Sequence, residues 1–430
     1  MPHNLITKIP GNPSTKILLG LLSGAALGIA ARVAAQGAPW LDWVVENVAL
    51  PIGQIFLRLL FMLVIPLLFS ALVIGISGLD VRRMGRMGGR MLGYTVVVSL
   101  IAVLIGMVLV NWLQPGAGLP DSLRHLASSS SFSISIPKPP ETSGVAMIVG
   151  MFPDNPVKAA AGGEMLGVII FSLIFGIGLS FTRTQAAMRL REVIEGLYDV
   201  SMTLIQGVLK LAPIGVAALV FSMTVRLGLE MFSYLMAYVG VVLLALGLHM
   251  FVVYPLSVRF LGKRSPLAFF LDARSAMFTA FSTASSTATL PVALTVAEVN
   301  LRLPRHVSRF VLTAGSAMNQ NGTALYEGVT VLFLAQLFGV HLDISQQLVV
   351  MLICVLGGIG TAGVPAGSLP VIAMIMGMFG IPLEGLALII GIDRFLDMCR
   401  TTLNVTGDLA AAVYVARGEE AAIAQAGEPS

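Results

Sequence analysis

The stretch Ser282-Thr-Ala-Ser-Ser-Thr-Ala-Thr-Leu-Pro291 interrupts an otherwise apolar segment, residues 266–300, with small polar residues and a proline. A second apolar segment, residues 347–380, is interrupted in the same way between Gly357 and Pro365. Each half is too short to cross the roughly 30 Å hydrocarbon layer of a bilayer as a helix. Each segment therefore predicts a re-entrant helical hairpin. The alternative is an ordinary helix kinked by glycine and proline.

The rest of the chain has the composition of a membrane protein. Of its 430 residues, 56% are hydrophobic and only 11% are charged, which is too apolar for a soluble core. Its apolar runs are long and uniform, which favours helices over the alternating strands of a barrel. We therefore expect an all-α membrane protein with eight transmembrane helices, near 17–35, 48–78, 91–113, 146–181, 200–224, 231–258, 308–339 and 384–416.

Basic residues sort onto alternate connections and indicate the topology. Clusters begin at Arg82, Arg183, Arg259 and Arg302, and these connections should face the cytoplasm, as should both termini, in a plasma (inner) membrane. The same distribution accounts for the formal net charge of +4 and does not indicate nucleic-acid binding. The polar stretch 115–145 is then an exterior loop. A cleaved signal peptide at the first apolar run is an alternative.

The last predicted helix carries ionisable groups that are expensive in a membrane. At about 100° per residue they share one face, an arc of roughly 100°. The members of this polar stripe are Asp393, Asp397, Arg400, Thr401, Asn404 and Asp408. They could line one wet cavity. The alternative is that Asp397 and Arg400 merely neutralise each other.

The stripe has the chemistry of an amino-acid site. A guanidinium binds a carboxylate through two parallel hydrogen bonds, and an aspartate accepts hydrogen bonds from an ammonium. An acidic amino acid satisfies both Arg400 and Asp397, whereas a C4-dicarboxylate or a small neutral amino acid satisfies only one. Three aspartates and one arginine sum to −2, and −1 if Arg394 is added. With an acidic substrate, roughly two or three monovalent cations would balance the site.

The span 308–339 is interrupted by Asn319-Gln-Asn-Gly-Thr323, which places amides, a hydroxyl and a glycine at mid-membrane. We expect the helix to unwind at Gly322. Unwound carbonyls, amide oxygens and carboxylates are hard ligands that suit Na⁺. The alternative is a kink whose amides bond across helices. Together with the two interrupted segments, this break favours a secondary transporter built from inverted repeats.

These motifs resemble the dicarboxylate/amino acid:cation symporter family, the glutamate transporters and their prokaryotic homologues. The resemblance is carried by four blocks in order: 285–291, 319–326, 360–365 and 397–408. It implies a homotrimer whose transport domain moves like an elevator against a scaffold. The implied division is scaffold at 1–90 and 146–225, transport domain at 91–114 and 226–416, and a cytoplasmic tail at 417–430.

The resemblance also implies site residues. The substrate contacts would be Ser286, Thr323, Val364, Asp397, Arg400, Thr401 and Asn404. One sodium ion would bind Gly315, Asn319, Asn404 and Asp408, and a second would bind Ala317, Gly358, Ile359 and Thr361 beneath the second hairpin.

The chain departs from the family pattern at a third cation site. Asn321 stands where the family usually has an aspartate, and of the assisting residues on the third helix only Ser99 remains, next to Val98. Gln320 replaces a methionine near the second sodium site. We therefore expect fewer than three coupled Na⁺, or H⁺ in place of one. The rival functions are a C4-dicarboxylate or small neutral amino acid symporter and a passive channel; no pattern typical of an enzyme is visible.

Overall fold

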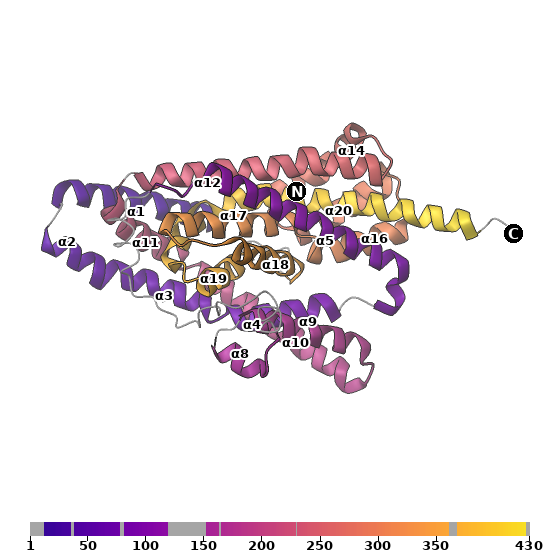
Figure 1. Cartoon of the computed structure of the whole chain (residues 1–430), viewed down its shortest axis with the longest axis horizontal. Coiled ribbons are helices and arrows are strands. Elements are labelled where there is room, and N and C mark those ends of the chain that lie inside the picture. The colour runs from indigo at the N-terminus through magenta and orange to yellow at the C-terminus, as the bar shows by residue number, and fades with distance from the viewer. Residues whose placement is uncertain are drawn as a thin grey trace, which may run out of the picture.

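The structure is a computed structural model that describes residues 13–35, 38–77, 81–118, 152–162, 165–228, 230–360 and 368–426. Every regular element in these ranges is a helix, which confirms the predicted all-α class. The helices form a bundle elongated along one axis (Figure 1). Most of the predicted exterior loop, and the site candidates Thr361 and Val364, lie outside the described residues.

The N-terminal half, up to residue 227, contains ten of the labelled elements. They are α1 (Pro13–Ala35), α2 (Pro39–Val44), η1 (Val45–Ala49), α3 (Leu50–Phe61), α4 (Val64–Ser77), α5 (Val81–Leu113), α8 (Pro156–Gly162), α9 (Met165–Phe181), α10 (Gln185–Leu209) and α11 (Ala212–Leu227). Helices α10 and α11 are bent by 54° relative to each other, and Pro213 lies in the first turn of the second helix. The predicted span 200–224 is therefore a broken one.

The C-terminal half carries the polar motifs. Its elements are α12 (Glu230–Leu248), η2 (His249–Val253), α13 (Tyr254–Leu256), η3 (Ser257–Leu261), α14 (Pro266–Thr283), α15 (Ser286–Thr295), η4 (Val296–Asn300), α16 (Arg305–Met318), α17 (Asn321–Phe338), α18 (Ile344–Gly360), α19 (Leu369–Met378), η5 (Leu383–Gly385) and α20 (Leu386–Ala426). Helix α20 continues through ten residues that the sequence assigned to the tail, because 417–426 is rich in alanine and glutamate, which are strong helix formers.

Four helices in the described ranges are long and apolar enough to cross a membrane. They are Lys16–Ala35, Pro39–Gly75, Arg86–Leu113 and Phe232–Leu261, and the bent pair α10–α11 makes a fifth if it is one span. Helix α20 has the length but carries Asp393, Arg394, Asp397 and Arg400. These helices agree with a membrane protein, and the count of eight spans stays a prediction.

The first interrupted segment is a helical hairpin rather than a kinked helix. Ala284, the residue after α14, is left-handed with φ 48°, and the extended Ser285 caps the start of α15 by accepting a hydrogen bond from the Ala288 amide at 3.2 Å. The two helices then pack against each other. Pro291 was expected in the break but lies inside α15, because the chain has already turned at Ala284.

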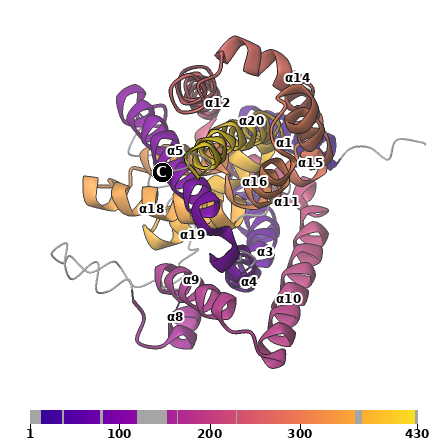
Figure 2. The same cartoon turned by 90° about the vertical axis from the view of Figure 1, so that its right-hand side faces the viewer.

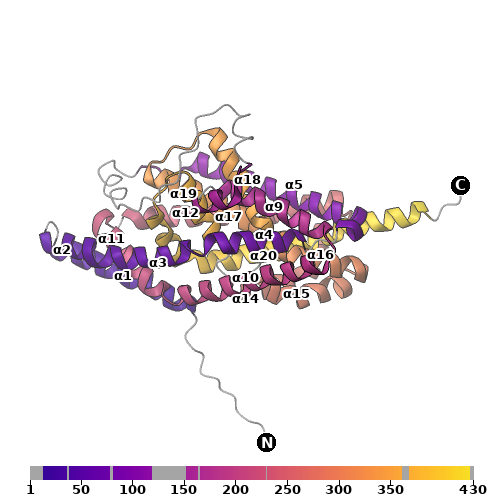
Figure 3. The same ribbon diagram turned by 90° about the horizontal axis from the view of Figure 1, so that it is seen from below.

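Helix α20 occupies the centre of the bundle, between the two pairs of short helices. Figures 2 and 3 show α14–α15 on one side of it and α18–α19 on the other. Helix α17, which is buried over nearly its whole surface, also packs against α20. The polar stripe of α20 therefore faces elements that all end or break near its middle.

The predicted break between α16 and α17 is confirmed, but its position differs from the expectation. Asn319 and Gln320 leave helical geometry, with ψ of 63° and 53°, whereas Gly322 is already in the first turn of α17. Gly322 serves a close approach instead. A Cβ there would lie 2.9 Å from the Arg400 carbonyl oxygen, which is closer than real Cβ contacts.

Helices α1 and α11 meet through a row of glycines spaced four residues apart. A Cβ at Gly20 would lie 2.3 Å from the Pro213 carbonyl oxygen, and one at Gly24 would lie 2.4 Å from that of Ala217. Small residues at this spacing let two membrane helices touch along their backbones. The row fixes the broken α10–α11 pair against the N-terminal helix.

We expect Gly24→Ala to destabilise the protein by roughly 1–3 kcal/mol, because the added methyl group must push two backbones apart. The measurement is thermal unfolding of the detergent-solubilised protein. Gly240→Ala is the matched control, since Gly240 is exposed in α12 and a Cβ there would meet no atom within 4 Å. Equal melting temperatures for the two variants would contradict the close approach.

Candidate functional site

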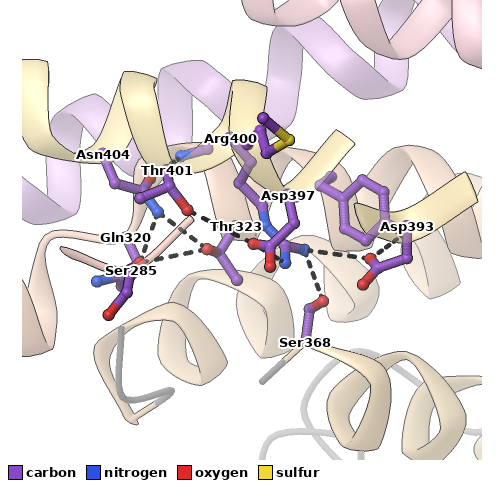
Figure 4. A network of polar contacts seen from close by, with 12 residues as sticks. Ser285, Gln320, Thr323, Ser368, Asp393, Asp397, Arg400, Thr401 and Asn404 are labelled. Atoms are coloured by element: carbon purple, nitrogen blue, oxygen red, sulfur yellow. Dashed lines mark hydrogen bonds and ion pairs between the residues drawn. The ribbon is translucent and has the colours of Figure 1, made fainter. Parts of the chain in front are cut away.

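Arg400 is the centre of a buried polar network (Figure 4). Its Nη2 donates to Asp397 Oδ1 at 2.6 Å, and its Nη1 donates to Ser368 Oγ at 2.6 Å and lies 4.0 Å from Asp393 Oδ1. The guanidinium also lies 4.6 Å from the ring centroid of Tyr326, whose hydroxyl donates to Asp393 at 2.8 Å. Groups from α17, from α20 and from the residue before α19 therefore surround the positively charged guanidinium of Arg400.

Asp397 and Arg400 form the predicted ion pair, but this pair involves only one of the two carboxylate oxygens of Asp397. The side chain of Asp397 is 5% exposed, and its Oδ2 has no hydrogen-bond partner in the part of the chain that the structure describes. Burying a carboxylate oxygen without a hydrogen-bond donor is unfavourable. Asp397 Oδ2 is therefore placed to accept a hydrogen bond from a donor that is not among the described residues. Mutual neutralisation alone does not explain the arrangement.

Asn404 joins α20 to the break before α17. Its Nδ2 donates to Gln320 Oε1 at 2.5 Å and to Thr323 Oγ1 at 3.1 Å, while its Oδ1 accepts from the Gly322 amide at 2.7 Å. Gln320 in turn donates to the Ser316 carbonyl at 2.9 Å. The amide of Gln320 thus fixes Asn404 and Thr323 beside Arg400.

A second group of oxygen atoms lies around Asp408, further along α20. Asn319 Nδ2 donates to Asp408 Oδ1 at 3.0 Å, and Asn319 Oδ1 is buried without a partner in the described ranges. Gly315 is adjacent, since a Cβ there would lie 2.6 Å from Asp408 Oδ1. One carboxylate with amide and carbonyl oxygens suits a hard cation. Asn404 is predicted to contribute its main-chain carbonyl to this set, and that prediction stands apart from its side-chain oxygen, which accepts from the Gly322 amide.

The second predicted cation set is described only in part. Ala317 lies in α16, and Gly358 in α18 faces the break, where a Cβ would be 3.3 Å from the Gln320 carbonyl oxygen. The side chain of Ile359 and all of Thr361 lie outside the described residues. Within those residues no cluster of three His, Cys, Asp or Glu side chains could hold a metal ion. Any cation here would rely on backbone and amide oxygens.

The residues predicted at the third cation site are joined by hydrogen bonds between neutral groups. Ser99 Oγ donates to Asn321 Oδ1 at 2.5 Å, Asn321 Nδ2 donates to the Tyr254 hydroxyl at 3.2 Å, and that hydroxyl donates to the Leu403 carbonyl at 3.1 Å. All four residues are buried. This neutral chain joins α5, α13, α17 and α20, and no carboxylate takes part in it.

The structure brings several of the predicted site residues together and adds contacts that the sequence did not predict. Ser286 is buried at the start of α15, and its neighbour Ser285 lies in the network that Figure 4 shows. Tyr326 and Ser368 were not predicted to contact Arg400. The first had a signal, because residues three apart share a helix face and Tyr326 follows Thr323 by three. The second had none, since its partner lies 32 residues away.

A buried cation–carboxylate network, enclosed by a broken helix and two pairs of short helices, is typical of secondary transporters. The profile of the sodium:dicarboxylate symporter family matches residues 14–418. The chain belongs to this family. Membership confirms the resemblance seen in the sequence and supports the expectation of a transporter rather than an enzyme.

Characterised relatives align over most of the chain. The proton/glutamate-aspartate symporter of Escherichia coli is 34% identical over 88% of this chain and 87% of its own length. The proton/sodium-glutamate symport protein of Geobacillus stearothermophilus is 32% identical over 94% of both chains. Human excitatory amino acid transporter 2 is 30% identical over 92% of this chain and 76% of its own.

We expect Gln320→Met to lower stability by about 1–3 kcal/mol, because it removes the acceptor of Asn404 and the donor to the Ser316 carbonyl in a buried place. Thermal unfolding in detergent measures this. Gln185→Met, at an exposed position on α10, controls for the side-chain change itself. An unchanged melting temperature for Gln320→Met would show that the amide is not needed to hold the network.

Proposed function

We propose that this chain is a secondary active symporter that moves an acidic amino acid, aspartate or glutamate, into the cell together with cations. The observation that carries the proposal is the buried Arg400 beside Asp397 Oδ2, an anion-binding group next to an acceptor that has no partner among the described residues. The substrate's side-chain carboxylate pairs with Arg400, and its ammonium donates to Asp397. The names of the bacterial relatives support the same substrate class.

The remaining predicted contacts complete this pocket as part of the proposal. In Figure 4, Thr323, Thr401 and Asn404 lie on the opposite side of Asp397 from Asp393, and they would receive the backbone carboxylate. Thr401 Oγ1 lies 3.5 Å from Asp397 Oδ1, and Asn404 donates to both Thr323 and Gln320. Ser286 and Val364 would close the pocket from the tips of the two hairpins.

Charge supports coupling to cations. Asp393, Asp397 and Asp408 outnumber Arg400 by two in the buried stripe, and an acidic substrate adds another negative charge. Entry of Na⁺ at Gly315, Asn319 and Asp408, and beneath the second hairpin, would offset this excess. The names of the relatives support both Na⁺ and H⁺ as coupling ions.

The proposed assembly follows the family pattern: a homotrimer in the plasma membrane, eight spans with two re-entrant hairpins arranged as inverted repeats, and both termini in the cytoplasm. Helix α5 and the elements from α12 to α20 would move as one body against α1 to α4 and α8 to α11. The neighbouring substrate classes, C4-dicarboxylates and small neutral amino acids, leave Asp397 or Arg400 without its partner.

Purified protein in proteoliposomes should accumulate labelled L-aspartate when a Na⁺ or H⁺ gradient is imposed. Arg400→Gln should lower kcat/KM for this uptake at least about a hundredfold. The substrate's side-chain carboxylate would lose its buried ion-pair partner, and loss of one partner of a buried ion pair costs several kcal/mol. Arg189→Gln, at an exposed site on α10, should leave uptake unchanged. Saturable accumulation excludes a passive channel, and absence of uptake under both gradients would refute the proposal.

The neutral chain at Asn321 gives a prediction about stoichiometry. The wild type should couple fewer than three Na⁺ to each substrate, measured as the voltage at which net flux is zero under fixed gradients. Asn321→Asp puts a carboxylate at that position and should raise the coupled cation count by one.

Asn155→Asp is the matched control, because an exposed aspartate at that helix start still accepts from the amide of Val157. A count of three Na⁺ in the wild type, or no change with Asn321→Asp, would contradict the prediction.

A further inference from the structure

Ser368 is the first described residue after the tip of the second hairpin, and its hydroxyl is used unusually. It precedes α19 in the position where serine commonly caps a helix through its side chain. The Ser368 side chain makes no capping bond. It is 1% exposed, and its Oγ accepts from Arg400 Nη1 at 2.6 Å instead. Figure 4 shows it on the opposite side of the network from Asn404.

Within the described residues, this hydroxyl still has a proton to donate. A serine hydroxyl is one donor and accepts through two lone pairs. The bond from Arg400 uses one lone pair, and the serine proton has no acceptor within the part of the chain that the structure covers. The same Nη1 lies 4.0 Å from Asp393 Oδ1, so Ser368 adjoins the guanidinium edge that also approaches Asp393.

We propose that Ser368 is a specificity-determining residue, whose hydroxyl donates a hydrogen bond to the side-chain carboxylate of the substrate while it accepts one from Arg400. This inference rests on the proposed function, since it requires an acidic substrate. A carboxylate that pairs with Arg400 comes within reach of the hydroxyl beside Nη1 and gains a third donor. Charge-assisted bonds of this kind are about twice as strong as neutral ones.

The arrangement discriminates between a carboxylate and a carboxamide. A carboxylate is acceptor-only and matches the guanidinium donors together with the serine donor. A carboxamide has one acceptor and presents its own N–H groups to the same donors, so it gains little from the Ser368 hydroxyl. Because Ser368 belongs to the arm of the second hairpin, the bond also ties the bound carboxylate to that arm.

The test compares uptake kinetics of Ser368→Ala with the wild type in proteoliposomes. The KM for L-aspartate should rise about tenfold, as expected for loss of a hydrogen bond to a charged group. The kcat should stay within about twofold, and the inhibition constant of L-asparagine should not change. Ser368→Thr keeps the hydroxyl and should restore the KM to near the wild-type value.

Two further variants complete the experiment. Ser172→Ala removes another buried serine hydroxyl, one that bonds the Val168 carbonyl in α9, and should leave the KM unaltered. Ser368→Gly removes the same hydroxyl as Ser368→Ala and replaces it if the alanine variant does not fold.

The outcomes separate the two proposals. If the wild type accumulates L-aspartate but removal of the Ser368 hydroxyl leaves its KM unchanged, or weakens L-aspartate and L-asparagine equally, Ser368 only holds Arg400 and the inference is overturned. If the wild type accumulates no acidic amino acid under either gradient, the proposed function fails and this inference fails with it.

Discussion

A guanidinium in the middle of an apolar bundle loses its hydration, and the penalty is several kcal/mol unless every N–H finds a partner. Around Arg400 these partners come from four directions: Asp397 one turn back on α20, Asp393 a further turn back, the ring of Tyr326 on α17, and Ser368 before α19. Asp397 and Asp393 lie on the continuous helix α20, whereas Tyr326 and Ser368 come from elements that begin near this level. Much of the architecture near the site can be understood as the means of bringing these groups to one cation.

The break before α17 illustrates this dependence. Because Asn319 and Gln320 leave the helix, the Gln320 side chain can turn toward Asn404, and the Asn319 side chain can turn toward Asp408. Gly322 then allows α17 to touch the backbone of α20 at Arg400. A continuous helix with a larger residue at 322 would hold the two helices apart and separate these pairs.

Helical periodicity was enough to predict that the stripe from Asp393 to Asp408 shares one face, and small polar residues were enough to predict the interruptions. These are local properties of the chain. The partners of the stripe depend on how separate helices approach one another, so the roles of Ser368 and Tyr326 were not visible. The places of Ser285, Ser286 and Pro291 in the first hairpin depend on the left-handed residue at its turn, Ala284. The turn is made at a single residue, and the composition of the stretch does not predict which residue that is.

The neutral chain from Ser99 through Asn321 and Tyr254 to the Leu403 carbonyl bears on how steeply a substrate could be concentrated. In a coupled carrier, each co-transported ion multiplies the limiting accumulation ratio by its own gradient, so a tenfold gradient contributes about 1.4 kcal/mol per ion. A carrier without an ion at this position has a lower limiting ratio. It also spends less of the cell's ion gradient on every molecule taken up, which favours it where substrate is plentiful and the ion gradient is weak.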